Sequence, residues 1–251
     1  MSRKIIVWLA GAGLICAGAV CYPALAQSMS AAIAAALADP ERPAADTARD
    51  ANRHPGEIIA FAGVKPGQKI AEFAPGGGYY TRILAKTVGP NGRVYSIYVA
   101  SQGDKAAKGA STVAATNPNV SLVPLNGTSF SLPEKVDVAW ITDNYHDFLN
   151  PGYGALDMPT FDKAILDVLK PGGVLLIEDY QTVPGAGATQ TSTLHRIEES
   201  LVKSQVTGAG FVFDGESPVL KNPNDDHTLK LFDPSIRGRV DQYVLRFRKP
   251  R

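Results

Sequence analysis

A glycine-rich segment directly after a short apolar strand carries the clearest binding chemistry of the chain. The expected strand, Lys69 to Phe73, contains the acid Glu72 and runs into Ala74-Pro75-Gly76-Gly77-Gly78. Glycine lets the backbone approach a ligand closely, and the N–H groups at the start of the next helix point toward that ligand. Thr81 stands where a dinucleotide fingerprint has its third glycine, and the Gly-Lys-Ser/Thr of a phosphate-binding loop is absent. The segment therefore predicts a ligand site of another type, with a tight structural turn as the alternative.

Polar side chains also follow two later strands, at residues 142–147 and at Glu178-Asp179. His146 has an unperturbed pKa suited to proton transfer near neutral pH, with Asp147 or Asp143 as the carboxylate that orients it. The alternative is that these side chains form local hydrogen bonds at the end of the strand. Glu178-Asp179 can supply another base, although a solvated acidic turn is the favoured interpretation.

Potential metal ligands are plentiful, but their spacing does not indicate a metal site. No pair such as His-x-x-x-His occurs, so we expect no bound metal ion. His54 and His195 are expected to be structural, the first at a helix start and the second on an amphipathic helix. Arg53, near Arg49 and Asp50, is assigned to a solvated face, with a part in the ligand site as the alternative. The residues considered as metal ligands are Asp143, His146, Asp147, Glu178, Asp179, Asp225, Asp226 and His227.

The hydrophobic pattern predicts strands that alternate with helices. Strands are expected at 69–73, 93–99, 120–125, 136–141, 174–177, 211–213 and 240–247, and helices at 30–38, 44–52, from Pro55, at 80–88, 104–115 and 161–169, and around Leu194, Ile197 and Leu201. Short apolar strands separated by helices predict a parallel sheet covered on both faces, and the last two strands require an antiparallel hairpin. We expect an α/β fold with a doubly wound, seven-stranded mixed sheet whose last strand is antiparallel. Ligands then bind at the carboxyl ends of the strands.

The segment 214–238 lacks periodicity. It is predicted to be either an ordered excursion near the site or a mobile loop.

The first 26 residues have the layout of a secretory signal peptide. Arg3 and Lys4 precede an uncharged apolar run from Ile5 to Val20, and Ala24-Leu25-Ala26 is a small-x-small cleavage site. The run is shorter than the roughly 20 residues of a membrane-spanning helix, and an uncleaved anchor is the alternative. Both cysteines lie in this segment, so the mature chain has no thiol. We expect a periplasmic or secreted protein composed of a signal peptide (1–26), an N-terminal helical leader (27–54) and one domain (55–251).

Composition and charge exclude some partners. The 251 residues include 25 Lys plus Arg and 24 Asp plus Glu, and a charge so close to zero gives no electrostatic reason to bind nucleic acid. We expect a small-molecule substrate, no nucleic-acid partner and no stable membrane insertion after signal cleavage.

Over about residues 55–248 the sequence resembles the class I S-adenosylmethionine-dependent methyltransferase family. That family has an acid followed by Gly-x-Gly-x-Gly, and Ala74, Gly76 and Gly78 stand at the three glycine positions. The run Leu169-Lys-Pro-Gly-Gly-Val-Leu-Leu-Ile177 is similar to the family's fifth strand and the turn before it. More narrowly, the secretory leader, Arg53-His54-Pro55, Gly76-Gly-Gly-Tyr-Tyr-Thr81, Asn144-Tyr-His-Asp147 and the carboxyl end at 241–250 resemble a bacterial group of exported predicted methyltransferases.

The resemblance implies a Rossmann-like methyltransferase fold and S-adenosyl-L-methionine as cofactor. Glu72 matches the acid that faces the methionine amino group of the cofactor. Tyr98 stands where the family has a carboxylate that accepts both ribose hydroxyls, and Asn126 stands where an acid often meets the adenine. The residues placed at the cofactor are Glu72, Ala74, Gly76, Gly78, Tyr98 and Asn126.

The resemblance also places the methyl-acceptor site after the fourth strand, with Asn144, His146 and Asp147 as catalytic candidates. Methyl transfer from a sulfonium is an in-line displacement, so the enzyme must mainly align the acceptor atom and remove its proton. We expect a methyltransferase that acts on a small molecule or an envelope component. The alternative is a degenerate or repurposed methyltransferase fold that binds another ligand in the periplasm, because two polar anchors for the cofactor are replaced.

Overall fold

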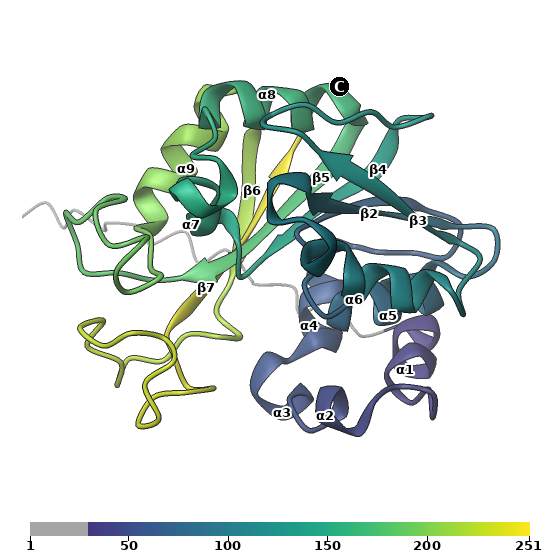
Figure 1. Ribbon diagram of the computed structural model, residues 1–251, viewed down its shortest axis with the longest axis horizontal. Coiled ribbons are helices and arrows are strands. Elements are labelled where there is room, and N and C mark those ends of the chain that lie inside the picture. Colours follow the sequence, from purple (N-terminus) through teal and green to yellow (C-terminus); the bar gives the residue numbers. More distant parts are fainter. Residues whose placement is uncertain (1–29) are drawn as a thin grey trace, which may run out of the picture.

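The computed structural model describes residues 30–251, so the expected signal peptide and both cysteines lie outside the described residues (Figure 1). The strands are β1 (Lys69–Phe73), β2 (Arg93–Val99), β3 (Val120–Leu125), β4 (Val136–Thr142), β5 (Leu169–Tyr180), β6 (Val212–Ser217) and β7 (Gln242–Arg248). The helices are α1 (Ala31–Leu37), α2 (Ala44–Thr47), α3 (Asp50–Arg53), α4 (Pro55–Ala62), α5 (Tyr79–Val88), α6 (Asp104–Ala114), α7 (Tyr145–Phe148), α8 (Met158–Val168) and α9 (Glu199–Gly208), with 3₁₀ turns at Ala100–Gln102 and Pro151–Tyr153.

The seven strands form one mixed sheet in the order β3-β2-β1-β4-β5-β7-β6. Strands β1 to β5 are parallel to one another, whereas β7 pairs antiparallel with both β5 and β6. The expected seven-stranded mixed sheet with an antiparallel last strand is therefore confirmed. Because β1 lies between β2 and β4, the direction of strand order reverses there, which opens a crevice at the carboxyl ends of these strands.

Helices cover both faces of the sheet, and each face buries alternate residues of the strands (Figure 1). Helices α1, α4, α5 and α6 pack on the face that carries Ile70, Val138 and Leu176. Helices α7, α8 and α9 pack on the face that carries Phe73, Ile141 and Ile177. This alternation is the period of two that places successive strand side chains on opposite faces.

The sequence predicted β1 to β4 closely, but several later elements differ, among them β6, which was expected at 211–213 and spans Val212–Ser217. Strand β5 continues through residues 178 and 179, since β4 pairs along one side of it and β7 along the other. Glu178 and Asp179 are therefore buried within the sheet, and the expected solvated acidic turn was wrong. The helix expected around Leu194 begins only at Glu199, so His195 lies in a turn, with a backbone φ of +57°.

The N-terminal segment packs on the sheet domain. Helix α1 buries Ile33 and Ala36 in the same apolar cluster as Leu84 of α5. The helix expected at 44–52 is divided into α2 and α3. No helix within residues 30–251 has both the length and the apolar composition needed to cross a membrane.

Between β6 and β7 the chain makes a long excursion without helix or strand, visible as the yellow-green loops below β7 in Figure 1. A buried ion pair attaches it to the rest of the domain. Arg196 is fully buried, and its guanidinium contacts both carboxylate oxygens of Asp225 at 2.9 and 3.1 Å. Arg196 also donates to the carbonyl oxygens of Leu229 and Gln181. The segment is thus an ordered excursion near the site, which is one of the two alternatives that the sequence left open.

We expect Arg196→Met to destabilise the protein, because it leaves the Asp225 carboxylate buried without its cation. Breaking a buried pair by removing one partner costs about 3–5 kcal/mol. Urea unfolding should show a loss of this order, and amide exchange within 218–241 should accelerate. Arg239→Met, at an exposed position of the same excursion, is the control and should change the free energy of unfolding by no more than about 0.5 kcal/mol. Equal losses in the two variants would contradict the anchoring role of Arg196.

Candidate active site

A cavity of about 510 Å³ opens at the carboxyl ends of β1 and β2. The glycine-rich turn between β1 and α5 forms one wall, and Tyr98 and Val99 at the end of β2 form another. Helix α6, Asn144 and Tyr153 complete the lining. A cavity of this size lies within the usual range of about 300–1,000 Å³ for small-ligand sites.

The glycine-rich turn adopts backbone angles that explain its sequence. Ala74, Gly76 and Gly78 have φ values of +52°, +53° and +80°, in the left-handed region that favours glycine. On one side the turn is pressed against α6, where a Cβ on Gly109 would lie 1.9 Å from the carbonyl oxygen of Gly76. On the other side, a Cβ added to Gly76 or Gly77 would meet no protein atom within 4 Å. Bare backbone therefore faces the cavity, as a closely held ligand requires.

Glu72 lies beneath this turn and does not line the cavity. Its side chain is 2% exposed, and Oε2 accepts hydrogen bonds from the hydroxyls of Thr81 and Ser96 at 2.7 and 3.3 Å. Burial raises the pKa of Glu72 to about 7, although the two hydroxyls oppose the shift. Glu72 is thus placed to support the turn from below. Its expected contact with the cofactor stays a prediction.

The structure places the other two polar cofactor candidates, Tyr98 and Asn126, in different surroundings. Tyr98 lines the cavity at the end of β2, as its alignment with the ribose position implies. Asn126 is exposed and pairs with Ser129 in a turn after β3, outside the cavity wall. Arg82, Lys105 and Lys108 also line the cavity, whose walls include no carboxylate.

A second cavity of about 530 Å³ adjoins the ends of β4 and β5. His146 and Asp147 of α7 line it, together with His195, Arg53 and residues of the excursion between β6 and β7. Two of the three catalytic candidates therefore face this cavity, whereas Asn144 lines the first one. The Nδ2 of Asn144 donates to the carbonyl of Thr142 at 2.7 Å and lies 3.4 Å from the carbonyl of Ala74. Asn144 thus connects the end of β4 to the glycine-rich turn, between the two cavities.

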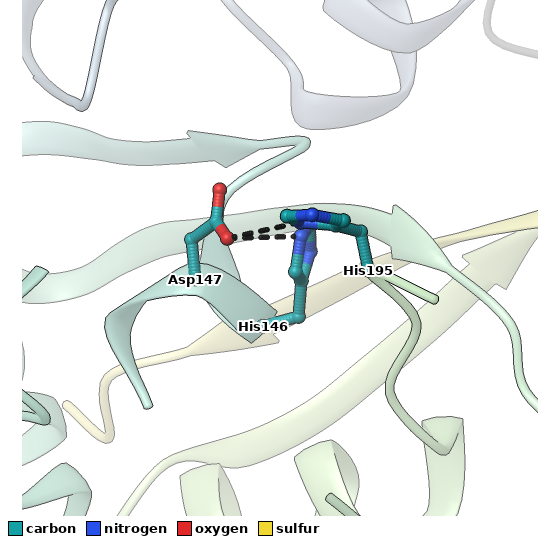
Figure 2. A group of neighbouring side chains, drawn as sticks. All are labelled: His146, Asp147 and His195. Carbon is teal, nitrogen blue, oxygen red and sulfur yellow. Dashed lines mark ion pairs between the residues drawn. The ribbon is translucent and has the colours of Figure 1, made fainter. Parts of the chain in front are cut away.

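His146 is held by Asp179 at one ring nitrogen and by the expected Asp147 at the other, whereas Asp143 pairs with Arg53 instead. Its Nδ1 lies 2.7 Å from Oδ1 of Asp179, and its backbone N–H donates to Oδ2 at 2.7 Å. Its Nε2 is 3.3 Å from Oδ1 of Asp147, and the same oxygen is 3.4 Å from Nδ1 of His195 (Figure 2). Burial lowers the pKa of His146, but the charge of Asp179 and hydrogen bonding to both carboxylates outweigh it and raise the pKa to about 10. In this arrangement His146 carries a proton at neutral pH and is not a free base.

Arg53 belongs to the second cavity and does not lie on a solvated face. Its guanidinium is 2.5 Å from Asp143 and 4.0 Å from Glu178, and it stacks over the rings of Tyr79 and Tyr80. Burial, with the nearby charge of Asp143, raises the pKa of Glu178 to about 8 against the opposing charge of Arg53. The N-terminal segment is therefore attached to the carboxyl edge of the sheet by charge as well as by apolar packing.

Sequence reasoning found the glycine-rich turn and the segment 143–147 but missed three participants. Asp179 was judged a solvated acid, His195 an ordinary helix residue and Arg53 a surface charge. Each of them comes from a distant part of the chain, and no local spacing marks it. One signal was present in the sequence, because the Glu178-Asp179 pair directly continues an apolar strand and shares its burial.

Known proteins with similar sequence are methyltransferases. No family model matches the chain. The ubiquinone/menaquinone biosynthesis C-methyltransferase UbiE of Pseudomonas paraeruginosa is 29% identical over 125 residues, which is 49% of this chain and 45% of that protein. The demethylmenaquinone methyltransferase of Staphylococcus aureus is 32% identical over 122 residues, or 47% of this chain and 46% of that protein. The chain spans about half the length of these curated relatives.

Solved structures with a similar fold include several methyltransferases and a [4+2]-cyclase, SpnF. A SAM-dependent methyltransferase from Aquifex aeolicus superposes with a TM-score of 0.58 at 19% identity, over 78% of this chain and 89% of that one. At such low identity the likeness shows the fold alone. Fold and sequence similarity together confirm the resemblance to class I S-adenosylmethionine-dependent methyltransferases and the Rossmann-like fold that it implied.

The raised pKa of Glu72 predicts a pH-dependent penalty on stability. Between its ordinary value of 4.5 and about 7 the folded protein keeps a proton that the unfolded chain releases, so this group lowers the stability as the pH rises through that window. Glu72→Gln should therefore raise the free energy of unfolding at pH 8 by about 2–3 kcal/mol and leave it unchanged near pH 4. Denaturant unfolding at the two pH values measures the difference.

Glu57→Gln, at an exposed position of α4, serves as the control for this measurement. We expect no pH-dependent gain from it. A Glu72→Gln protein that is no more stable than the parent at pH 8 would show that Glu72 is ionised without penalty in the folded state.

Proposed function

We propose that the chain is an S-adenosylmethionine-dependent methyltransferase that acts on a small molecule or an envelope component. The observation that carries this proposal is the bare glycine-rich turn bordering a cavity at the point of strand reversal. Similarity to methyltransferases in sequence and in fold supports the same class of reaction.

The first cavity suits an adenosyl cofactor. Gly76 and Gly77 offer a surface without side chains, where adenosine and methionine atoms can lie against the backbone. Tyr98 is placed to offer one hydrogen bond to the ribose, and the amide of Asn144 marks the end of the cavity that adjoins the second one. The bound cofactor would supply an electrophilic methyl group on a sulfonium.

The second cavity is the proposed acceptor site. It lies next to the first along the segment 143–147, so an acceptor held there would lie beside the proposed cofactor site. Asp147 faces this cavity, and although burial raises its pKa, hydrogen bonding to His146 and the positive charge there hold it below the ordinary value. Asp147 is thus ionised at neutral pH and can accept the acceptor's proton, a role that His146 does not fill while protonated.

We also propose that the protein is exported and that its partner is a small molecule and not a nucleic acid. The support is the arrangement of Arg3, Lys4, the apolar run and the Ala24-Leu25-Ala26 site, together with the balanced charge of the chain.

Expression of the full chain in a Gram-negative host tests export. Intact mass spectrometry of the periplasmic fraction should show a protein that begins at Gln27. Replacing Ala24 and Ala26 by bulky residues should prevent cleavage. Recovery of an uncleaved chain from the cytoplasm in both cases would contradict the proposal.

Calorimetric titration with S-adenosylmethionine tests the proposed function, and Gly77→Val is the sharpest variant. Gly77 does not have the left-handed backbone of Gly76 and Gly78, and a side chain there meets only open space. The valine therefore projects into the cavity without straining the turn. We expect the parent to bind the cofactor and the variant to bind it at least about 100-fold more weakly, a difference near 2.7 kcal/mol.

Gly208→Val, in helix α9 and outside the cavity wall, is the matched control and should bind as the parent does. No binding heat from the parent at millimolar cofactor would remove the methyltransferase assignment and favour a repurposed fold. Equal binding by the parent and Gly77→Val would show that the cofactor does not lie on the glycine-rich turn.

A further inference from the structure

Three potential metal ligands converge on one point of the second cavity. They are Nε2 of His146, an oxygen of Asp147 and Nδ1 of His195, and these atoms all lie within 4.8 Å of one another. Figure 2 shows the two imidazole rings directed toward the same carboxylate oxygen, which is 3.3 Å from the first nitrogen and 3.4 Å from the second. A tetrahedral ion with bonds of about 2.0–2.1 Å separates neighbouring ligand atoms by about 3.3–3.4 Å. The three ligand atoms therefore already define two edges of a coordination tetrahedron.

The coordinating nitrogen of His146 pairs with another member of the cluster. Nε2 is buried, and its ion pair with Oδ1 of Asp147, at 3.3 Å, already holds two of the three ligand atoms side by side. A divalent cation placed between the three ligand atoms would replace the proton on Nε2, because a histidine nitrogen binds a metal ion only when it is deprotonated.

Asp179 gives His146 the support that metal-bound histidines usually have. Its carboxylate is fully buried and contacts Nδ1 at 2.7 Å, which fixes the ring and leaves Nε2 as the atom that faces the cavity. It is itself held by the backbone N–H groups of His146 and Tyr180. A carboxylate behind a ligating histidine orients the ring and makes it a better donor.

We propose that His146, Asp147 and His195 form a binding site for a single divalent transition-metal ion of the Zn²⁺ type. Two imidazole nitrogens and one carboxylate oxygen suit such an ion better than Mg²⁺ or Ca²⁺, which prefer oxygen ligands. All three ligands line the second cavity, so the fourth coordination position opens toward it. An ion there would hold an oxygen or nitrogen donor of whatever molecule occupies the cavity.

The site stands on these contacts alone and does not depend on methyl transfer. If the second cavity also receives the methyl acceptor, as proposed above, the ion would bind the acceptor atom and lower its pKa, and Asp147 would then act through the ion. The acceptor would accordingly carry an oxygen or nitrogen donor group.

Calorimetry with ZnCl₂ on the tag-free, chelator-treated protein from Gln27 to Arg251, which contains no cysteine, tests the site without any cofactor. We expect one equivalent to bind at micromolar or tighter affinity, and MgCl₂ to give no binding at the same concentrations. His195→Gln and Asp147→Asn should each weaken Zn²⁺ binding at least about 100-fold, and Asp179→Asn should weaken it about 10–100-fold through the orientation of His146. Since His195 is partly exposed, its substitution keeps the test valid if the variants at buried positions fail to fold.

The chain contains four histidines, so the other two provide matched controls. His54→Gln and His227→Gln should bind Zn²⁺ as the parent does. Replacing Zn²⁺ by Co²⁺ should give a visible absorption band in the parent that His195→Gln lacks. The proposal is overturned if the parent does not bind Zn²⁺ below millimolar concentration, or if the control variants lose as much affinity as His195→Gln.

Discussion

The reversal of strand order at β1 is the constraint on which both cavities depend. Strand β1 pairs in parallel with β2 on one side and with β4 on the other, so the connections leave it in opposite directions. The carboxyl ends of these strands consequently remain free of crossing chain. The glycine-rich turn emerges at the end of β1 and the segment 143–147 at the end of β4, and the amide of Asn144 lies 3.4 Å from the carbonyl of Ala74. The first cavity therefore borders Asn144, and the second borders its neighbours Asp143 and His146.

Three carboxylates are buried near the carboxyl ends of the strands, where burial works against the stability of the fold. Burying a carboxylate costs several kcal/mol unless a partner compensates for the lost water. Glu72 has only hydroxyl donors, and its pKa rises to about 7. Asp179 is compensated by His146, and Glu178 accepts from Tyr80 and Gln242 near Arg53. These three buried carboxylates lie on β1 and β5, and two of them have raised pKa values. Perturbed titratable groups of this kind gather at functional sites.

What the sequence predicted and what it missed have a common physical explanation. The bounds of β1 and β2 could be read residue by residue, because apolar strands closed by glycine or proline depend on local pattern. The position of the glycine-rich turn could be predicted for the same reason. The partners of His146 in distant segments could not be predicted in this way. Asp179 reaches His146 because β5 pairs with β4. His195 reaches the same place from a turn, although the apolar spacing of Leu194 and Ile197 indicated a helix there. The spacing of residues along the chain predicts helices and strands well and contacts between distant segments poorly.

The N-terminal segment contributes side chains to the site. Asp50 accepts from the hydroxyl of Tyr79 at 2.6 Å, and Arg53 reaches Asp143 across the carboxyl edge. The guanidinium of Arg53 also stacks on the ring of Tyr79, the first residue of the helix that follows the glycine-rich turn. One arginine therefore links the turn that borders the first cavity to the end of the strand that borders the second. Any movement of this segment would change both walls together. The sequence favoured a solvated face for Arg53 and left a part in the ligand site as the alternative, and the contacts with Asp143 and Tyr79 agree with that alternative.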